Sequence, residues 1–149
     1  MRIFLDTSLL SDSGLSEFGE EIVEQVVGGS SFYVSAITHF QLLWGYSLAG
    51  LSPARYEAFL EQTATEVVPP TKFDASAAAA MKPSKADLLD ALIAASVKRY
   101  DANIWTLDRD FLKFLPKTGV RIIRARGEAR SRASGAKGRE PVPATGREK

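Results

Sequence analysis

Apolar residues along this chain follow two spacings: short continuous runs, and positions three or four apart. The runs are rich in β-branched and aromatic residues and end at polar residues or proline, which predicts strands. These predicted strands cover residues 2–5, 31–36, 65–70, 103–108 and 120–123. Helical spacing predicts helices over residues 16–27, from 38 toward 50, from 52 onward, and over 74–82, 84–100 and 109–114. The alternation predicts an α/β sandwich on a mostly parallel sheet, where ligands bind beyond the carboxyl ends of strands.

Two of the predicted helices carry start signals. Thr38 is followed three residues later by Gln41, a capping-box pattern that predicts a helix start at Thr38. Ser84 with Asp87 marks the start of the clearest helix, which is predicted to end near Tyr100. Asp90 therefore falls within the first two turns of that helix.

The composition narrows the possible chemistry. The chain has 149 residues, 45% hydrophobic and 25% charged, which is typical of one ordinary globular domain. It has no cysteine, and His39 is its single histidine. The lack of cysteine excludes disulfide frameworks, thiolate nucleophiles, zinc fingers and iron–sulfur sites. With one histidine, the chain has almost no residues from which to build a Ser-His-Asp triad. Any catalysis by this chain must therefore use mainly carboxylate, hydroxyl, amide and lysine side chains.

The net charge of +1 is a cancellation between two parts of the chain. Residues 1–123 carry 11 Lys/Arg and 15 Asp/Glu, a net charge of −4, and residues 124–149 carry 8 and 3, a net charge of +5. The second part has no Leu, Ile, Phe, Trp or Tyr, so it cannot bury enough apolar surface to fold. We predict a folded domain at 1–123 and a disordered basic tail at 124–149. The tail either contacts phosphates or is a solubilising end or expression remnant.

The amino-terminal residues MRIFLDTSLL lack the long apolar region of a signal peptide, and no stretch of the chain approaches the roughly 20 apolar residues of a membrane span. A cytoplasmic location is the expectation.

Three aspartates stand out by their placement. Asp6 ends the first predicted strand, Asp108 ends the strand at 103–108, and Asp90 begins the clearest helix. Carboxylates gathered at one sheet edge repel one another unless a cation neutralises them, and Mg²⁺ or Mn²⁺ suits an all-oxygen site. Alternatively, Asp90 is a solvated helix residue, and Asp108 or Asp110 caps the following helical turn. Asp6 has no capping role unless a helix follows at once.

Four short blocks of the sequence resemble the motifs of a known family. They are LDTS at 5–8, SAIT..QLLWG at 35–45, DALIAA at 90–95 and TLDRDF at 106–111. In this order and spacing they resemble PIN-domain nucleases, most closely the VapC-like toxins. The resemblance implies a three-layer α/β/α sandwich with a central parallel sheet, Mg²⁺ or Mn²⁺ held by acidic residues, and endonucleolytic cleavage of RNA. It also implies a homodimer and inhibition by a partner antitoxin.

The resemblance assigns roles to particular residues. Asp6, Asp90 and Asp108 match the acidic metal ligands, and Asp110 matches a further, more variable acid. Thr106 and Ser8 match hydroxyl positions that support the carboxylates; turn hydrogen bonds are their alternative role.

One block departs from the family pattern, because Gln41 stands where the family normally has glutamate. A glutamine oxygen can still ligate as a neutral dipole, or Gln41 can serve only as the capping partner of Thr38. Asp87, one turn before Asp90, either helps to restore the missing charge or only partners Ser84. We therefore expect a working nuclease of lowered metal affinity, with a non-catalytic module that binds RNA or protein as the alternative.

Other residues could contact nucleic acid or a partner. Candidate phosphate contacts are Lys82, Lys85, Arg109 and Lys113, each of which could equally be solvated surface. We expect Trp44 and Tyr46 to belong to the core or to a dimer interface.

Overall fold

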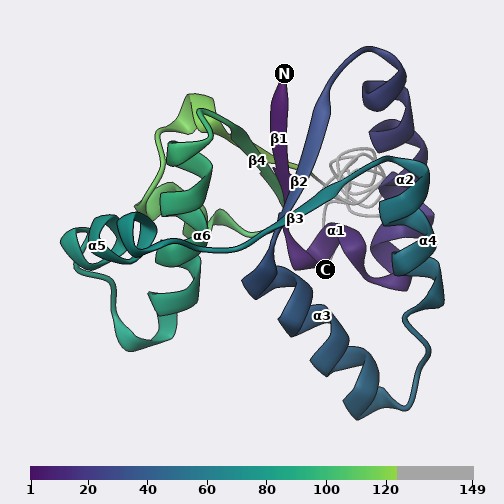
Figure 1. Cartoon of the computed structure of the whole chain (residues 1–149), viewed down its shortest axis with the longest axis horizontal. Helices are drawn as coiled ribbons and strands as arrows, with labels where there is room; N and C mark the ends of the chain where they lie inside the picture. The colour runs from purple at the N-terminus through teal and green to yellow at the C-terminus, as the bar shows by residue number, and fades with distance from the viewer. Residues whose placement is uncertain (124–149) are drawn as a thin grey trace, which may run out of the picture.

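A five-stranded parallel sheet forms the centre of the domain, and the computed structural model describes residues 1–123 (Figure 1). The strand order is β3-β2-β1-β4-β5, with every neighbouring pair parallel. The strands are β1 (Arg2–Leu5), β2 (Ser31–Ser35), β3 (Glu66–Val68), β4 (Asn103–Thr106) and β5 (Val120–Ile122). The predicted α/β fold with a parallel sheet is confirmed.

Helices cover both faces of the sheet and give three layers, with α1, α2 and α4 on one side and α5 and α6 on the other (Figure 1). The α-helices are α1 (Thr7–Leu10), α2 (Asp12–Val27), α3 (Ala36–Ala49), α4 (Ala54–Gln62), α5 (Lys72–Ala80) and α6 (Leu88–Arg99). Short 3-10 turns lie at η1 (Lys85–Asp87), η2 (Arg109–Lys113) and η3 (Lys117–Gly119). No helix among residues 1–123 has the length and apolarity needed to cross a membrane.

Successive side chains of β1 pack into the two hydrophobic clusters on opposite faces of the sheet. Ile3 and Leu5 pack into the cluster beneath α1 to α4, whereas Phe4 packs with Ile93 and Val97 of α6. Successive side chains of a strand point to opposite faces, so a fully buried run such as Ile3–Leu5 serves two layers at once.

Two features of the chain directly after β1 differ from the sequence-based expectation. Helix α1 follows β1 at once, although no helix was expected before residue 16. Helix α2 begins at Asp12, because the Ser11 side chain accepts a hydrogen bond from the Gly14 amide. A Cβ at Gly14 would clash with the Ser8 carbonyl, so glycine is what lets α1 and α2 lie this close.

The predicted cap at Thr38 is wrong. Ser35 caps α3, since its hydroxyl accepts a hydrogen bond from the Ile37 amide, and the helix begins three residues early. Thr38 is fully buried inside α3, and its hydroxyl has no hydrogen-bond partner among residues 1–123. Gln41 therefore lies in the second turn of the helix and has no capping-box role.

The strand order indicates that a ligand site lies at the carboxyl ends of β1 and β4. The connections reverse direction between β1 and β4, and ligands of open α/β sheets bind at the carboxyl ends of strands at such a point. Asp6 directly follows β1, and β4 ends at Thr106, so Asp108 lies two residues beyond the strand that was expected to reach it. The predicted tail, residues 124–149, lies outside the described residues.

Candidate functional site

Asp6 lies at the carboxyl end of β1, buried against β4. Its Oδ2 accepts a 2.7 Å hydrogen bond from the Thr106 hydroxyl and a longer one of 3.4 Å from the Ser8 hydroxyl. Asp6 occupies the N-cap position of α1, but its side chain makes no capping hydrogen bond. A helix does follow Asp6 at once, then, yet the carboxylate is directed to Thr106.

Burial raises the pKa of Asp6 above its usual value. Hydrogen bonds from Thr106, the Thr7 backbone and Ser8 act in the opposite direction, and the nearby charge of Asp108 raises the pKa further. A cation close to Asp6 would act in the same direction as these hydrogen bonds and stabilise its ionised form.

Thr106 and Ser8 join the ends of two adjacent strands. Besides donating to Asp6, the Thr106 hydroxyl accepts a hydrogen bond of 2.9 Å from the Asp108 amide. The Ser8 hydroxyl accepts a hydrogen bond of 3.2 Å from the Leu107 amide. Both hydroxyls therefore hold the loop after β4 against the end of β1.

Asp90 is the third residue of α6 and the most perturbed carboxylate of the group. Burial raises the pKa of Asp90 to about 6, and the charges of Asp6, Asp108, Asp110 and Asp87 contribute in that order. Four acidic side chains from three parts of the chain therefore act on one carboxylate.

The tightest acidic group within the described residues is not the predicted trio. It consists of Asp87, Asp90 and Asp110, which offer carboxylate oxygens all within 4.8 Å of one another. The Lys113 ammonium contacts Asp87 Oδ2 at 3.2 Å and Asp110 Oδ1 at 3.3 Å. A side-chain cation therefore already lies against the outer part of the cluster.

Asp87 both pairs with Ser84 and belongs to the acidic group around Asp90. The Ser84 hydroxyl donates to Asp87 Oδ2 at 2.9 Å, and hydrogen bonds from Ser84 and Lys113 hold the pKa of Asp87 below its usual value. Asp87 also belongs to the group around Asp90. Its partnership with Ser84 and its closeness to the acidic cluster are thus compatible.

Asp108 caps η2, because its Oδ1 accepts a 2.9 Å hydrogen bond from the Asp110 amide. Capping uses one oxygen of a carboxylate that has two, so it does not prevent metal ligation by the other.

Gln41 lies in the second turn of α3 and lines a groove. Together with Thr7, Ser8 and Gly45 it lines a groove of about 450 Å³ between α3 and the chain from α1 into α2. The groove begins next to Asp6, since Ser8 belongs to both. Gln41 and the Asp6 partner Ser8 therefore line the same groove.

The other candidates fall in several places. Lys85 and Arg109 are exposed on η1 and η2, and Lys82 is exposed just beyond α5. Tyr46 is buried, with its hydroxyl 3.1 Å from Asp12 Oδ1, whereas Trp44 is exposed.

The sequence reasoning did not predict that Lys113 bridges two acidic residues. The three-residue spacing of Asp110 and Lys113 in a helical turn is a signal that could have found it.

The donor set fits a hard divalent cation. Asp6, Asp87, Asp108 and Asp110 all act on the charge of Asp90, and Asp87, Asp90 and Asp110 offer oxygens within 4.8 Å of one another, so a cation placed among them would be stabilised. Oxygen-only ligands favour Mg²⁺ or Mn²⁺ over softer metals.

A family model described as PIN domain matches residues 3–114. The chain belongs to the PIN domain family. A comparison with curated proteins gives no match.

Solved structures with the same fold come from bacterial complexes. VapBC2 from Rickettsia felis bound to a DNA fragment from its promoter has a TM-score of 0.64 at 15% identity, covering 81% of this chain and 98% of that one. A toxin–antitoxin complex from Klebsiella pneumoniae has a TM-score of 0.56 at 20% identity, covering 80% and 95%. FitAcB from Neisseria gonorrhoeae has a TM-score of 0.53 at 22% identity, covering 74% and 91%. These likenesses establish the fold of this PIN domain.

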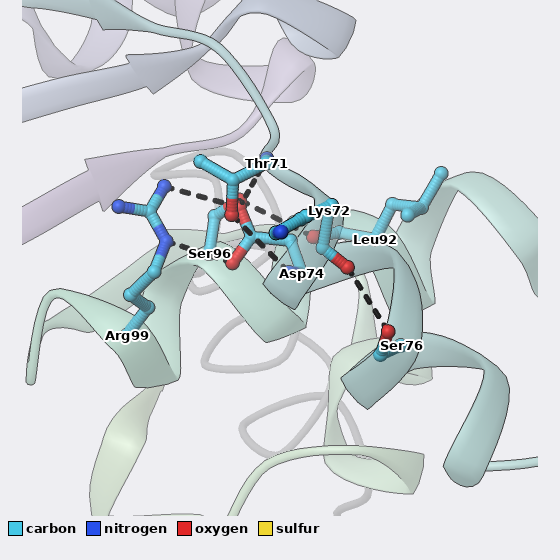
Figure 2. A network of polar contacts seen from close by, with 7 residues as sticks. All are labelled: Thr71, Lys72, Asp74, Ser76, Leu92, Ser96 and Arg99. Carbon is cyan, nitrogen blue, oxygen red and sulfur yellow. Dashed lines mark hydrogen bonds and ion pairs between the residues drawn. The ribbon is translucent and has the colours of Figure 1, made fainter.

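Away from the cluster, Asp74 of α5 makes a buried ion pair with Arg99 of α6 (Figure 2). Asp74 Oδ1 lies 2.8 Å from Arg99 Nε, and its Oδ2 accepts hydrogen bonds from Arg99 Nη2, Ser96 and the Thr71 amide. These contacts fasten α5 to the last turns of the helix whose first turn carries Asp90.

Proposed function

We propose that this PIN domain is an endoribonuclease dependent on Mg²⁺ or Mn²⁺. The observation that carries the proposal is the set of carboxylates around Asp90: burial, together with the charges of these neighbours, raises the pKa of Asp90 to about 6. Asp6, Asp90 and Asp108 are proposed as the metal ligands, with Asp110 and Asp87 as adjacent acids. A bound ion would lower the pKa of a water molecule and neutralise charge on a phosphoryl oxygen.

The chain's own contribution is to hold the oxygens in place. Thr106 fixes Asp6 Oδ2, and the Thr106 hydroxyl and the Asp110 amide position the Asp108 backbone and side chain respectively. The Lys113 ammonium restrains Asp87 and Asp110 on the outer side. Carboxylates held in this way are pre-organised for a cation, which reduces the cost of binding it.

The decisive experiment measures cleavage and metal binding on the same preparations. Full-length protein is incubated with a panel of structured RNAs in Mn²⁺, in Mg²⁺ and with a chelator, and Mn²⁺ binding is measured by calorimetry. We expect metal-dependent cleavage that Asp90→Asn abolishes, while Glu66→Gln, an acid on the edge strand β3, leaves it unchanged. Absence of both Mn²⁺-dependent cleavage and Mn²⁺ binding would overturn the proposal.

A second function is favoured by one observation. Gln41 is neutral at the position where the family pattern has glutamate, so this chain has less charge than that pattern. A module that binds RNA or protein without cleavage would accommodate that loss. RNA binding that is detectable by gel shift, unaffected by metal and accompanied by no cleavage would support this alternative.

We propose further that the nuclease is the toxin of a toxin–antitoxin pair. The Klebsiella pneumoniae structure of the same fold is a toxin–antitoxin complex. Two interior helix glycines also support a protein partner, because a Cβ on Gly19 or Gly45 would meet nothing within 4 Å. Each glycine lines a groove, and glycine in a helix interior costs about 1 kcal/mol relative to alanine. Close approach of another chain is a reason to retain it.

Induced expression in a bacterial host tests the toxin role. We expect growth arrest with the natural sequence and growth with Asp90→Asn at equal protein level. Relief of arrest by co-expression of a small open reading frame neighbouring the gene would identify the antitoxin. We also infer a homodimer, and the cytoplasmic location remains a prediction.

A further inference from the structure

The last described residue, Ile123, lies at the same edge of the sheet as the candidate site. Strand β5 runs parallel to β4 with Ile122 opposite Thr106, and the Ile123 amide donates a 2.9 Å hydrogen bond to the Thr106 carbonyl. The Thr106 hydroxyl in turn donates to Asp6. One residue of β4 therefore contacts both the buried acid of the site and the residue after which the basic segment 124–149 begins.

The position of Ile123 is fixed by packing. Its side chain is buried and belongs to the same hydrophobic cluster as Leu5 and Trp105, which lie near the carboxyl ends of β1 and β4. Consecutive Cα atoms are about 3.8 Å apart, so Arg124 is tethered at this edge. The basic segment therefore starts beside the candidate site.

The first nine residues of the segment carry its highest density of positive charge. Residues 124–132 contain four arginines and one acid, Glu128, a net charge of +3, and residues 133–149 add only +2. Arginine presents a planar fork of donors that matches the oxygens of a phosphate. Nine fully extended residues span at most about 30 Å, so these side chains stay close to the site. They are Arg124, Arg126, Arg130 and Arg132.

The described part of the chain offers RNA little positive charge at this edge. Its net charge is −4, and Lys113 beside the acidic cluster already contacts Asp87 and Asp110. Lys85 and Arg109 are exposed, but they lie on the same two turns as these acids. A phosphate that approaches the site therefore meets carboxylates, and further cations would offset the repulsion.

We propose that residues 124–132 are a phosphate-binding arm for the RNA held at the candidate site. The inference rests on the proposed RNA substrate and adds contacts to phosphates beside the scissile one, independent of base sequence. Internal pairing of the arginines with the acids of the site is the competing arrangement. RNA is favoured because Lys113 already contacts two of those acids, whereas the phosphates of an incoming strand bring no cation from the protein.

The test measures RNA binding in the presence of a chelator, so that metal-dependent cleavage does not occur. Full-length protein is titrated into a fluorescein-labelled single-stranded RNA of mixed sequence, and fluorescence anisotropy is recorded between about 50 and 200 mM salt. Each phosphate contact contributes about 0.7 to the slope of the logarithm of the binding constant against the logarithm of salt concentration. The natural sequence should therefore lose roughly 50-fold more affinity over this range than a variant with four contacts removed. That variant combines Arg124→Gln, Arg126→Gln, Arg130→Gln and Arg132→Gln.

The matched control removes the same charge farther along the chain. It combines Lys137→Gln, Arg139→Gln, Arg147→Gln and Lys149→Gln, and its slope should change by less than about 1. Equal changes in the two variants would overturn the assignment to residues 124–132, because any positive charge on the chain would then serve. Unchanged or tighter RNA binding by the four-arginine variant would also overturn it, and tighter binding would identify internal pairing with the acids.

These measurements separate the arm from the nuclease activity, because they are made without metal. A slope that becomes shallower in a protein that cleaves no RNA would support the arm and contradict the nuclease. With Mn²⁺ present, the four-arginine variant should have a raised KM and an unchanged kcat, the signature of lost uniform binding. Cleavage by the variant with the natural KM would contradict the arm and leave the nuclease in place.

Discussion

Thr106 and Asp6, 100 residues apart in sequence, are joined by a 2.7 Å hydrogen bond from hydroxyl to carboxylate. Both residues are buried at the carboxyl ends of neighbouring strands, and the Thr106 hydroxyl also accepts from the Asp108 amide. One hydroxyl therefore orients Asp6 and fixes the loop that carries Asp108.

Thr106→Val removes this hydroxyl while keeping the volume of the side chain. We expect Mn²⁺ affinity to fall about 10- to 100-fold, the usual effect of losing a group that orients a ligand. Calorimetry would measure it, with Thr106→Ser expected to retain most of the affinity. Thr118→Val, on the exposed turn η3, serves as the control. Unchanged affinity in Thr106→Val would show that Asp6 needs no orientation by Thr106.

Asp90→Asn should stabilise the metal-free protein. The folded pKa of about 6 lies above the usual 3.8, so the folded state binds the Asp90 proton more tightly than the unfolded state does. Its contribution to the free energy of unfolding is therefore most favourable below pH 3.8 and is lost as pH rises through 6. At pH 7.5 the variant should gain about 1 kcal/mol after solvent screening, visible as a higher Tm.

The same comparison at pH 4 provides the control for Asp90. Near that pH the natural side chain is protonated in the fold and the stability gain should largely disappear. A gain of equal size at pH 4 and pH 7.5 would rule out charge repulsion as its cause.

Gln41→Glu should strengthen metal binding. It adds a carboxylate on the groove beside the cluster, where the family normally has glutamate, and we expect several-fold tighter Mn²⁺ binding with faster RNA cleavage. Gln62→Glu on α4 is the matched control, since it adds the same charge away from the site. Equal gains in both variants would mean that overall charge, rather than position, is responsible.

Asp74→Asn should destabilise the fold without removing the metal site. It leaves Arg99, whose side chain is 33% exposed, without its counter-charge, and we expect urea unfolding to show a loss of about 1 to 3 kcal/mol. Burial raises the pKa of Asp74, but the hydrogen bonds from Arg99, the Thr71 amide and Ser96 outweigh it and lower the pKa overall. Asp74 therefore stabilises the fold above pH 3.8, and this contribution is lost as pH falls through the lowered folded pKa.

Two results would contradict that account of Asp74. One is a variant as stable as the natural chain at pH 7, and the other is a loss of Mn²⁺ binding by variant protein that is still folded. Asp101→Asn, an exposed acid in the turn before β4, should change neither property.

The sequence alone determined the strands, the parallel sheet and the position of Asp6, because apolar runs and their polar ends are local signals. It also indicated Ser84 and Asp87 as neighbours, and Asp108 as a cap. It misplaced the start of α3, since Ser35 and Thr38 are equally good caps locally. Burial of Thr38 against the core decides between them.

Only the tertiary structure decided the pKa values and the ion-pair partners of the aspartates. The effect of burial on Asp90, the contact of Lys113 with Asp87, and the pairing of Arg99 with Asp74 all depend on how segments apart in the chain pack together. Electrostatic energies depend on distance and solvent exposure, which residue types and spacing do not specify. The residues of the candidate site could thus be named from sequence, but their protonation and partners required the fold.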